Sequence, residues 1–215
     1  SMDRLFEEGM RFTSAYTPAS MCTPSRYSLI TGGLPGRCRS EGFLEAFPLD
    51  QPYSIGWTTH VEEGQLTIPR LLSQAGYVTG MVGKWHLGRE DLEHFGLPEL
   101  DPDADLDDPD VDRKLKRRHD RLAAYVEESA GFDHAAGVMY MNFDNHPVKA
   151  LHKHNFPWIT KRALEFIEAH GSGDSPFFLY MAPTAVHGPN HRDDLKKDVK
   201  YTPEGIMDGL EAYNI

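Results

Sequence analysis

Short apolar runs separated by helix-like segments form the main pattern of this chain. Residues Tyr77–Val82 and Phe177–Ala182 are largely apolar, and their length is typical of buried strands. Residues Trp158–His170 predict an amphipathic helix, because apolar side chains recur near one face. This alternation predicts an α/β fold with a mostly parallel central sheet flanked by helices. The apolar positions of that helix face are Ile159, Ala163, Phe166 and Ile167.

Further elements are predicted in the N-terminal part of the chain. Thr67 is expected to cap a helix over Ile68–Ala75 that ends at Gly76. Residues Met10–Tyr16 alternate apolar and polar side chains, which predicts a strand. The preceding residues, Asp3–Glu8, have the pattern of the last part of a helix.

One predicted helix N-terminus lies directly beside a cysteine. Thr23 is expected to be the N-cap, with Pro24 at the first helical position and Gly32 at the end of the helix. Cys22 would then lie just before the helix, where free amide groups and the helix dipole favour an anion.

Composition and charge narrow the possible functions. The chain has 215 residues, of which 40% are hydrophobic and 26% charged, as in an ordinary globular domain. A net charge of -11 disfavours a nucleic-acid binder, although a local cationic cluster can still bind a small anion. Two cysteines, Cys22 and Cys38, do not make a disulfide framework, although one bridge between them is possible. No apolar run approaches the length of a membrane span.

Three motifs follow one another in the order of a known family. Residues Cys22–Arg26 read CTPSR and continue as YSLITGGLP. Residues Gly83–Gly88 read GKWHLG, and residues Ala182–Pro189 read APTAVHGP. The chain thus resembles the type I, formylglycine-dependent sulfatases of the alkaline phosphatase superfamily. The resemblance runs over residues 3–189, with insert-like loops at 35–65 and 90–157. It implies that residues 1–215 form part of a catalytic sulfatase domain that is incomplete at both ends.

This resemblance implies a covalent mechanism for sulfate ester hydrolysis. In the family a dedicated maturase oxidises the motif cysteine, here Cys22, to formylglycine, whose hydrated aldehyde is a geminal diol. One diol oxygen attacks sulfur and forms a sulfo-enzyme, and loss of the second proton expels sulfate. The implied substrate is a sulfated small molecule or sugar, and the implied compartment is periplasmic, secreted or lysosomal.

The same resemblance assigns roles to five residues and one metal ion. Arg26 is expected to steady the diol, and Lys84 to bridge the nucleophile and a sulfate oxygen. His86 would accept the proton that triggers sulfate release, and His187 would contact the leaving oxygen. A calcium ion would bind the diol formed from Cys22, with its remaining ligands outside this chain.

Two alternatives remain open. Phosphate or phosphonate ester hydrolases of the same superfamily share the CxPSR nucleophile, so the reaction at sulfur is not fixed by the motif. A truncated, non-catalytic remnant would also keep these motifs.

Other residue patterns suggest metal sites but have ordinary explanations. Four aspartates have the spacing of a calcium loop, but Leu106 stands where the required glycine should be, so a solvated acidic loop is expected. Residues 114–121 are expected to be a charged helix face. Three histidines lack a partner fixed by spacing, so we interpret them as substrate-pocket or surface residues instead of zinc ligands. These two sets are Asp101, Asp103, Asp105 and Asp112, and His146, His152 and His154.

We predict that this chain alone has negligible sulfatase activity. The family's calcium ligands, an Asp pair and an Asp-Asn pair, fall outside the sequence, as does a further lysine near the leaving group. Asp144-Asn145 precedes His187 and is in the wrong order to be the second pair. Assay of the purified chain with an aryl sulfate should give no turnover above that of a Cys22→Ser variant, and measurable turnover would contradict the prediction.

Overall fold

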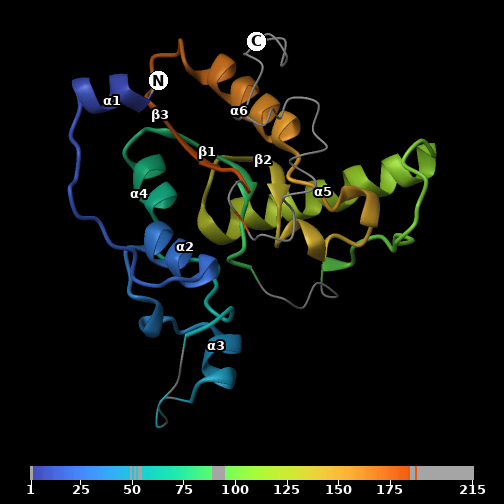
Figure 1. Ribbon diagram of the computed structural model, residues 1–215, viewed down its shortest axis with the longest axis horizontal. Helices are drawn as coiled ribbons and strands as arrows, with labels where there is room; N and C mark the ends of the chain where they lie inside the picture. Colours follow the sequence, from blue (N-terminus) through green and yellow to red (C-terminus); the bar gives the residue numbers. More distant parts are fainter. Residues whose placement is uncertain are drawn as a thin grey trace.

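Three parallel strands form the centre of the domain. The computed structural model describes residues 2–48, 50, 52, 55–88, 95–184 and 187. Strands β1 (Val78–Lys84), β2 (His134–Met139) and β3 (Phe177–Ala182) pair in the order β2-β1-β3 (Figure 1). Each connection between them contains a helix, as a parallel sheet requires. The predicted α/β fold with a parallel sheet is therefore confirmed.

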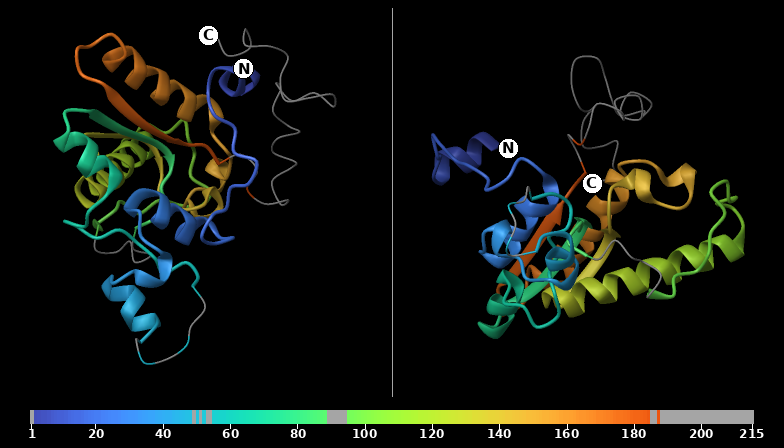
Figure 2. Two further views of the ribbon diagram at one scale, coloured as in Figure 1. Left: turned by 90° about the vertical axis from the view of Figure 1, so that its left-hand side faces the viewer. Right: turned by 90° about the horizontal axis from the view of Figure 1, so that it is seen from below.

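Helices cover both faces of this sheet. Helix α6 (Phe156–His170) lies on one face, and α5 (Pro109–Ala130) lies on the other (Figure 2). Side chains alternate along β1, so Met81 packs in the core beneath α5 while Val82 packs in the core beneath α6. The fold therefore has three layers with a separate apolar core on each side of the sheet.

The other helices lie mainly in the N-terminal part of the described chain. Helix α2 (Cys22–Thr31) packs Tyr27 and Ile30 into the core beneath α5. The remaining short elements are α1 (Met2–Glu8), η1 (Pro35–Arg37), α3 (Glu41–Ala46), α4 (Ile68–Gln74), η3 (Phe143–Asn145) and η4 (Lys149–Leu151).

Several sequence predictions agree closely with the structure. The side chain of Thr67 accepts a hydrogen bond from the amide of Arg70 and caps α4 as expected. Strand β3 has the predicted bounds, and β1 is close to its predicted range. In α6 three of the four predicted apolar positions are buried, whereas Ile167 is 40% exposed at the edge of the packed face.

Two local predictions were wrong. Residues 10–16 form no strand: Met10 is 76% and Tyr16 92% exposed. Alternation produces a strand only where a neighbouring backbone and an apolar face are available, and neither lies beside this segment among the described residues. Thr23 is also not the N-cap, because α2 already begins at Cys22 and Met21 is its N-cap. Thr23 is buried inside the first helical turn instead of facing the free amides.

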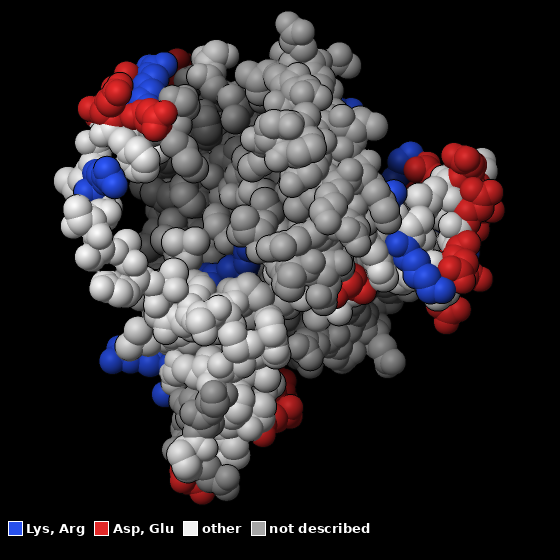
Figure 3. Space-filling model, in the orientation of Figure 1, with Lys and Arg blue, Asp and Glu red and all other residues white. Residues whose placement is uncertain are grey.

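Strand β2 and the full extent of α5 were not predicted from the sequence. Helix α5 is 22 residues long, and its buried residues all belong to its second half, from Leu122 onward. Its first half is densely charged and projects beyond the sheet, where basic and acidic side chains gather on the surface (Figure 3). Asp108 caps this half, and the pairs Lys116–Asp112 and Arg113–Asp110 connect neighbouring turns.

The carboxyl end of β1 is bent by a close contact with β3. Gly83 has a φ of 96°, and a Cβ there would lie 2.2 Å from the carbonyl oxygen of Ala182. The register between β1 and β2 shifts at the same point, between Val82 and Gly83. Only glycine allows both the positive φ and this backbone approach. Gly83 therefore sets the direction in which Lys84 and the following residues leave the sheet.

Replacing Gly83 with alanine should strongly destabilise the domain. We expect Gly83→Ala to lower the free energy of unfolding by at least about 2 kcal/mol, because it adds a backbone clash to an unfavourable φ. Urea unfolding followed by circular dichroism measures this change. Gly173→Ala is the matched control, since its added Cβ would meet one atom at 3.6 Å. Equal stability of the two variants would contradict the prediction.

Candidate active site

Cys22 is the first residue of α2 and faces the carboxyl end of β1. Its Sγ lies 3.2 Å from Nδ1 of His86 and 3.6 Å from Nζ of Lys84. The thiol is partly exposed, whereas the other cysteine, Cys38, is buried in the core. The two cysteines are both free in the structure, so the possible bridge between them is not formed.

Lys84 is the last residue of β1 and is 2% exposed. Its ammonium donates hydrogen bonds to the side-chain oxygen of Asn142 and to Cys22 Sγ. Burial lowers the pKa of Lys84, and the nearby guanidinium of Arg26 lowers it further. Lys84 is thus a buried cation held between α2 and the segment that follows β2.

His86 adopts a left-handed backbone conformation, with a φ of 57°. Its amide donates to the carbonyl of Tyr140 over 2.8 Å, which fixes the backbone, and its ring stacks on Trp57 with the centroids 5.5 Å apart. Burial, with smaller effects from Lys84 and Arg26, lowers the pKa of His86 to about 3. The imidazole is therefore neutral at neutral pH and can accept a proton.

Arg26 lies one helical turn beyond Cys22. Its guanidinium donates to the carbonyl oxygen of Lys84 over 2.7 Å and to the hydroxyl of Tyr180 over 3.1 Å. Burial raises the pKa of Tyr180, so its hydroxyl stays protonated at neutral pH. Arg26 thereby connects α2 to both β1 and β3 and places a positive charge beside the site.

His187 lies on the loop that follows β3. Its amide donates to the carbonyl of Thr184 over 3.3 Å, and its ring lies 6.3 Å from that of Phe143. The Thr184 hydroxyl is in turn hydrogen-bonded to the ring of His154 over 2.9 Å. A charge interaction with His187 is among the effects that lower the pKa of His86. His187 therefore lies within electrostatic reach of His86.

The structure connects four of the five predicted site residues by hydrogen bonds, and His187 lies within electrostatic reach of His86. Lys84 and His86 contact Cys22 directly, whereas Arg26 contacts the backbone of Lys84. Asn142 and Tyr180 were missed by the sequence analysis. Asn142 follows β2, so recognising that strand would have made it a candidate by its position beyond a strand end.

The side chains of the other predicted patterns make no hydrogen bond to Cys22 among the described residues. Asp101, Asp105 and Asp108 accept hydrogen bonds from nearby backbone amides, and Asp103 pairs with Lys149. Of the three histidines of the sequence pattern, His146 lines a cavity, and the ring of His152 hydrogen-bonds to the backbone carbonyl of His146. His154 is buried and hydrogen-bonds to Thr184. Within the described part of the chain, no three His, Cys, Asp or Glu residues gather as a metal site.

Comparisons with known proteins identify the family of the chain. The sulfatase family model matches residues 1–208. The chain belongs to the sulfatase family. This sulfatase chain is 32% identical over 211 residues to arylsulfatase G of Canis lupus familiaris, covering 91% of the chain and 37% of that relative. It is 43% identical over 188 residues to an arylsulfatase of Hemicentrotus pulcherrimus, covering 86% of the chain and 32% of the relative. The sulfatase chain thus spans about a third of the length of these curated relatives.

The fold is also found in solved structures. A protein studied for glycosaminoglycan metabolism by Bacteroides thetaiotaomicron matches 87% of the sulfatase chain and 46% of its own, with a TM-score of 0.51 and 23% identity. This likeness supports the α/β assignment. None of the described helices of the sulfatase chain is long and apolar enough to cross a membrane.

The two thiols should differ sharply in reactivity. Iodoacetamide should modify Cys22 of the native protein first, because Cys38 is 1% exposed and packed against Ser40. Peptide mapping by mass spectrometry locates the label, and Cys38 should react only in urea. A Cys22→Ser control should take up no label before unfolding. Native labelling of Cys38 at the rate of Cys22 would contradict the described packing.

Proposed function

We propose that the full-length protein is a sulfuric ester hydrolase that uses a formylglycine derived from Cys22. The observation that carries the proposal is the convergence of His86 Nδ1, at 3.2 Å, and Lys84 Nζ, at 3.6 Å, on Cys22 Sγ. The first turn of α2, which begins at Cys22, adds the favourable field of a helix N-terminus for an anion.

The described side chains suit the steps of this chemistry. In formylglycine an oxygen atom replaces Sγ on the same carbon atom. The position of Sγ therefore marks where a diol oxygen would lie, beside both Lys84 and His86. Attack of one diol oxygen on sulfur releases the alcohol and leaves a sulfo-enzyme. Neutral His86 can then take the proton of the second hydroxyl as the carbon–oxygen double bond re-forms and sulfate departs.

Positive charge around Cys22 favours an anionic ester. The charges of Lys84 and Arg26 both lower the pKa of His86, and His187, on the loop that follows β3, has the same effect. A sulfate ester carries a negative charge that spreads onto the leaving oxygen in the transition state, and fixed cations stabilise it there. His187 would contact the leaving oxygen of the ester. Arg26 would hold the backbone of Lys84 in place and help to neutralise the negative charge of the sulfate group.

Calcium does not fit the described residues alone. The side chains that contact Cys22 donate from nitrogen, and calcium requires several oxygen ligands. The side-chain oxygen of Asn142 already accepts a hydrogen bond from Lys84. The charge of Asp144 has only a small effect on the pKa of Lys84. The family's calcium ion would therefore need ligands beyond the described residues, and no step of the mechanism above depends on it.

The names of the relatives support a proposal for the substrate class. One of them, 32% identical over 198 residues, is named N-acetylgalactosamine-6-sulfatase in Mus musculus, and others are arylsulfatases. A sulfated sugar or aryl sulfate is therefore the proposed substrate, and a maturase is the proposed modifying partner.

Co-expression with a formylglycine-generating maturase should convert Cys22 alone. Peptide mapping should show the mass loss of thiol-to-aldehyde conversion in the Cys22 peptide and an unchanged Cys38 peptide, which serves as the internal control. Trapping the aldehyde with a hydroxylamine probe confirms its identity. Absence of the aldehyde when a known sulfatase is converted in the same cells would falsify the formylglycine proposal.

The reaction itself is tested on the full-length gene product. Lys84→Ala and His86→Ala should each lower kcat on an aryl sulfate by about 10²- to 10⁴-fold, because each removes a group that acts in the transition state. Lys149→Ala should leave kcat unchanged, since Lys149 pairs with Asp103 on the surface. Faster cleavage of a matched aryl phosphonate than of the aryl sulfate would favour the phosphonate alternative and reject the sulfatase.

A further inference from the structure

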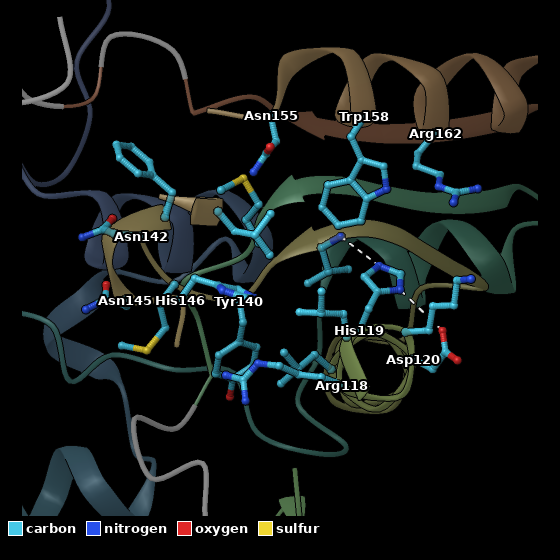
Figure 4. A pocket seen from close by; sticks show the side chains of 18 of the residues that line it. Arg118, His119, Asp120, Tyr140, Asn142, Asn145, His146, Asn155, Trp158 and Arg162 are labelled. Atoms are coloured by element: carbon cyan, nitrogen blue, oxygen red, sulfur yellow. Dashed lines mark hydrogen bonds and ion pairs between the residues drawn. The ribbon is translucent and has the colours of Figure 1, made fainter. Parts of the chain in front are cut away.

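A separate cavity of about 460 Å³ adjoins the candidate active site. It lies between α5, the end of β2, η3 and the start of α6 (Figure 4). Its volume is within the range of small-molecule sites in proteins. None of the proposed catalytic steps uses this space.

The walls of the cavity are suited to binding a sugar ring or an aromatic ring. Leu115, Met139 and Trp158 supply apolar surface, and Trp158 projects from α6 toward His119 on α5, with the two ring centroids 5.3 Å apart. Amide groups of Asn145 and Asn155 lie at the lining. A mostly apolar wall with a few polar groups is typical of sites that bind sugars or aromatic rings.

One cation of the lining has no counter-charge among the described residues. Lys116 pairs with Asp112 at 2.7 Å, and Arg162 pairs with Glu165 at 2.7 Å. Arg118, in contrast, makes no hydrogen bond or ion pair with any residue in the described ranges, and it extends from α5 toward Tyr140 and His146 (Figure 4). Burial lowers the pKa of Arg118, as expected for a partly desolvated cation.

The nearby histidines do not add to this charge at neutral pH. Burial, with a smaller effect from Arg118, lowers the pKa of His146 to about 4. Burial also lowers the pKa of His119, whose Nε2 accepts from the amide of Val138. Among the cations of the lining, Arg118 is therefore the one whose charge a ligand would neutralise.

Asn142 connects the cavity with the cysteine. It lines the cavity, and its side-chain oxygen accepts from Lys84 Nζ, which itself lies 3.6 Å from Cys22 Sγ. A ligand in the cavity would thus lie one side chain away from the cationic cluster around Cys22.

We propose that this cavity binds a ring of the substrate that carries a second anionic group, a carboxylate or a sulfate, and that Arg118 forms an ion pair with that group. The proposal rests on the proposed function, because it places the esterified end of the same molecule at Cys22. Guanidinium groups bind carboxylate and sulfate oxygens in pairs, and partial burial strengthens that interaction.

Binding is measured by calorimetry with two probes that differ in one charge, 4-nitrophenyl β-D-glucuronide and 4-nitrophenyl β-D-glucoside. The native protein should bind the glucuronide at least about tenfold more tightly than the glucoside. Arg118→Gln should abolish that difference. Arg117→Gln, the same charge change at an exposed neighbouring position, should alter either dissociation constant by less than about twofold.

A second measurement avoids any variant. Phenylglyoxal labelling of the native protein should be slowed at Arg118 by the glucuronide, with no protection at Arg117. Equal affinity for the two probes, equal effects of the two variants, or protection at neither arginine would overturn the cavity proposal. Because these measurements need no turnover, they also separate the two proposals. An active sulfatase with charge-independent binding rejects only the cavity, and charge-selective binding without an aldehyde or sulfatase activity rejects the proposed function.

Discussion

The buried ammonium of Lys84 is the constraint on which the site depends. An almost fully buried cation costs several kcal/mol unless its hydrogen atoms find acceptors. Its acceptors come from two other elements, because Cys22 begins α2 and Asn142 follows β2. The backbone of the same residue accepts from Arg26, which also reaches Tyr180 on β3. The hydrogen bonds of Lys84 therefore connect α2 with β1 and with the segment that follows β2, and Arg26 extends this connection to β3.

This arrangement explains why a strongly acidic chain can still suit an anion. Exposed acidic side chains, such as those of Asp101, Asp103, Asp105 and Asp107, contribute to the net charge of -11. Positive groups, in contrast, meet where the dielectric is low and their fields are poorly screened. Desolvation keeps His86 neutral beside these cations, so the cluster combines electrostatic attraction with one proton acceptor. The two properties are what the proposed sulfate ester chemistry requires.

How much the sequence could predict depended on the kind of signal. Elements with a strong local signal, such as the Thr67 cap of α4 and the apolar face of α6, were predicted well. Strand β2 was missed because its sequence, HAAGVM, is short and weakly apolar, and neighbouring strands and helices decide its structure. The site residues identified by motif came together, whereas Asn142 could not be found without β2. The strand predicted at residues 10–16 failed because alternation does not supply a pairing partner.

The position of Arg118 on the inward face of α5 favours a role in binding over a role in solubility. Residues four apart on a helix share a face, so Arg118 lies on the same stripe as Leu122 and Val126, which are both buried. Solubility requires charge on the outer face, where Arg113 already forms an ion pair with Asp110. Burying part of the Arg118 guanidinium on the inward face of α5 costs desolvation free energy. No carboxylate among the described residues forms an ion pair that would offset this cost. Such a cost is characteristic of a functional site, where a ligand supplies the missing charge.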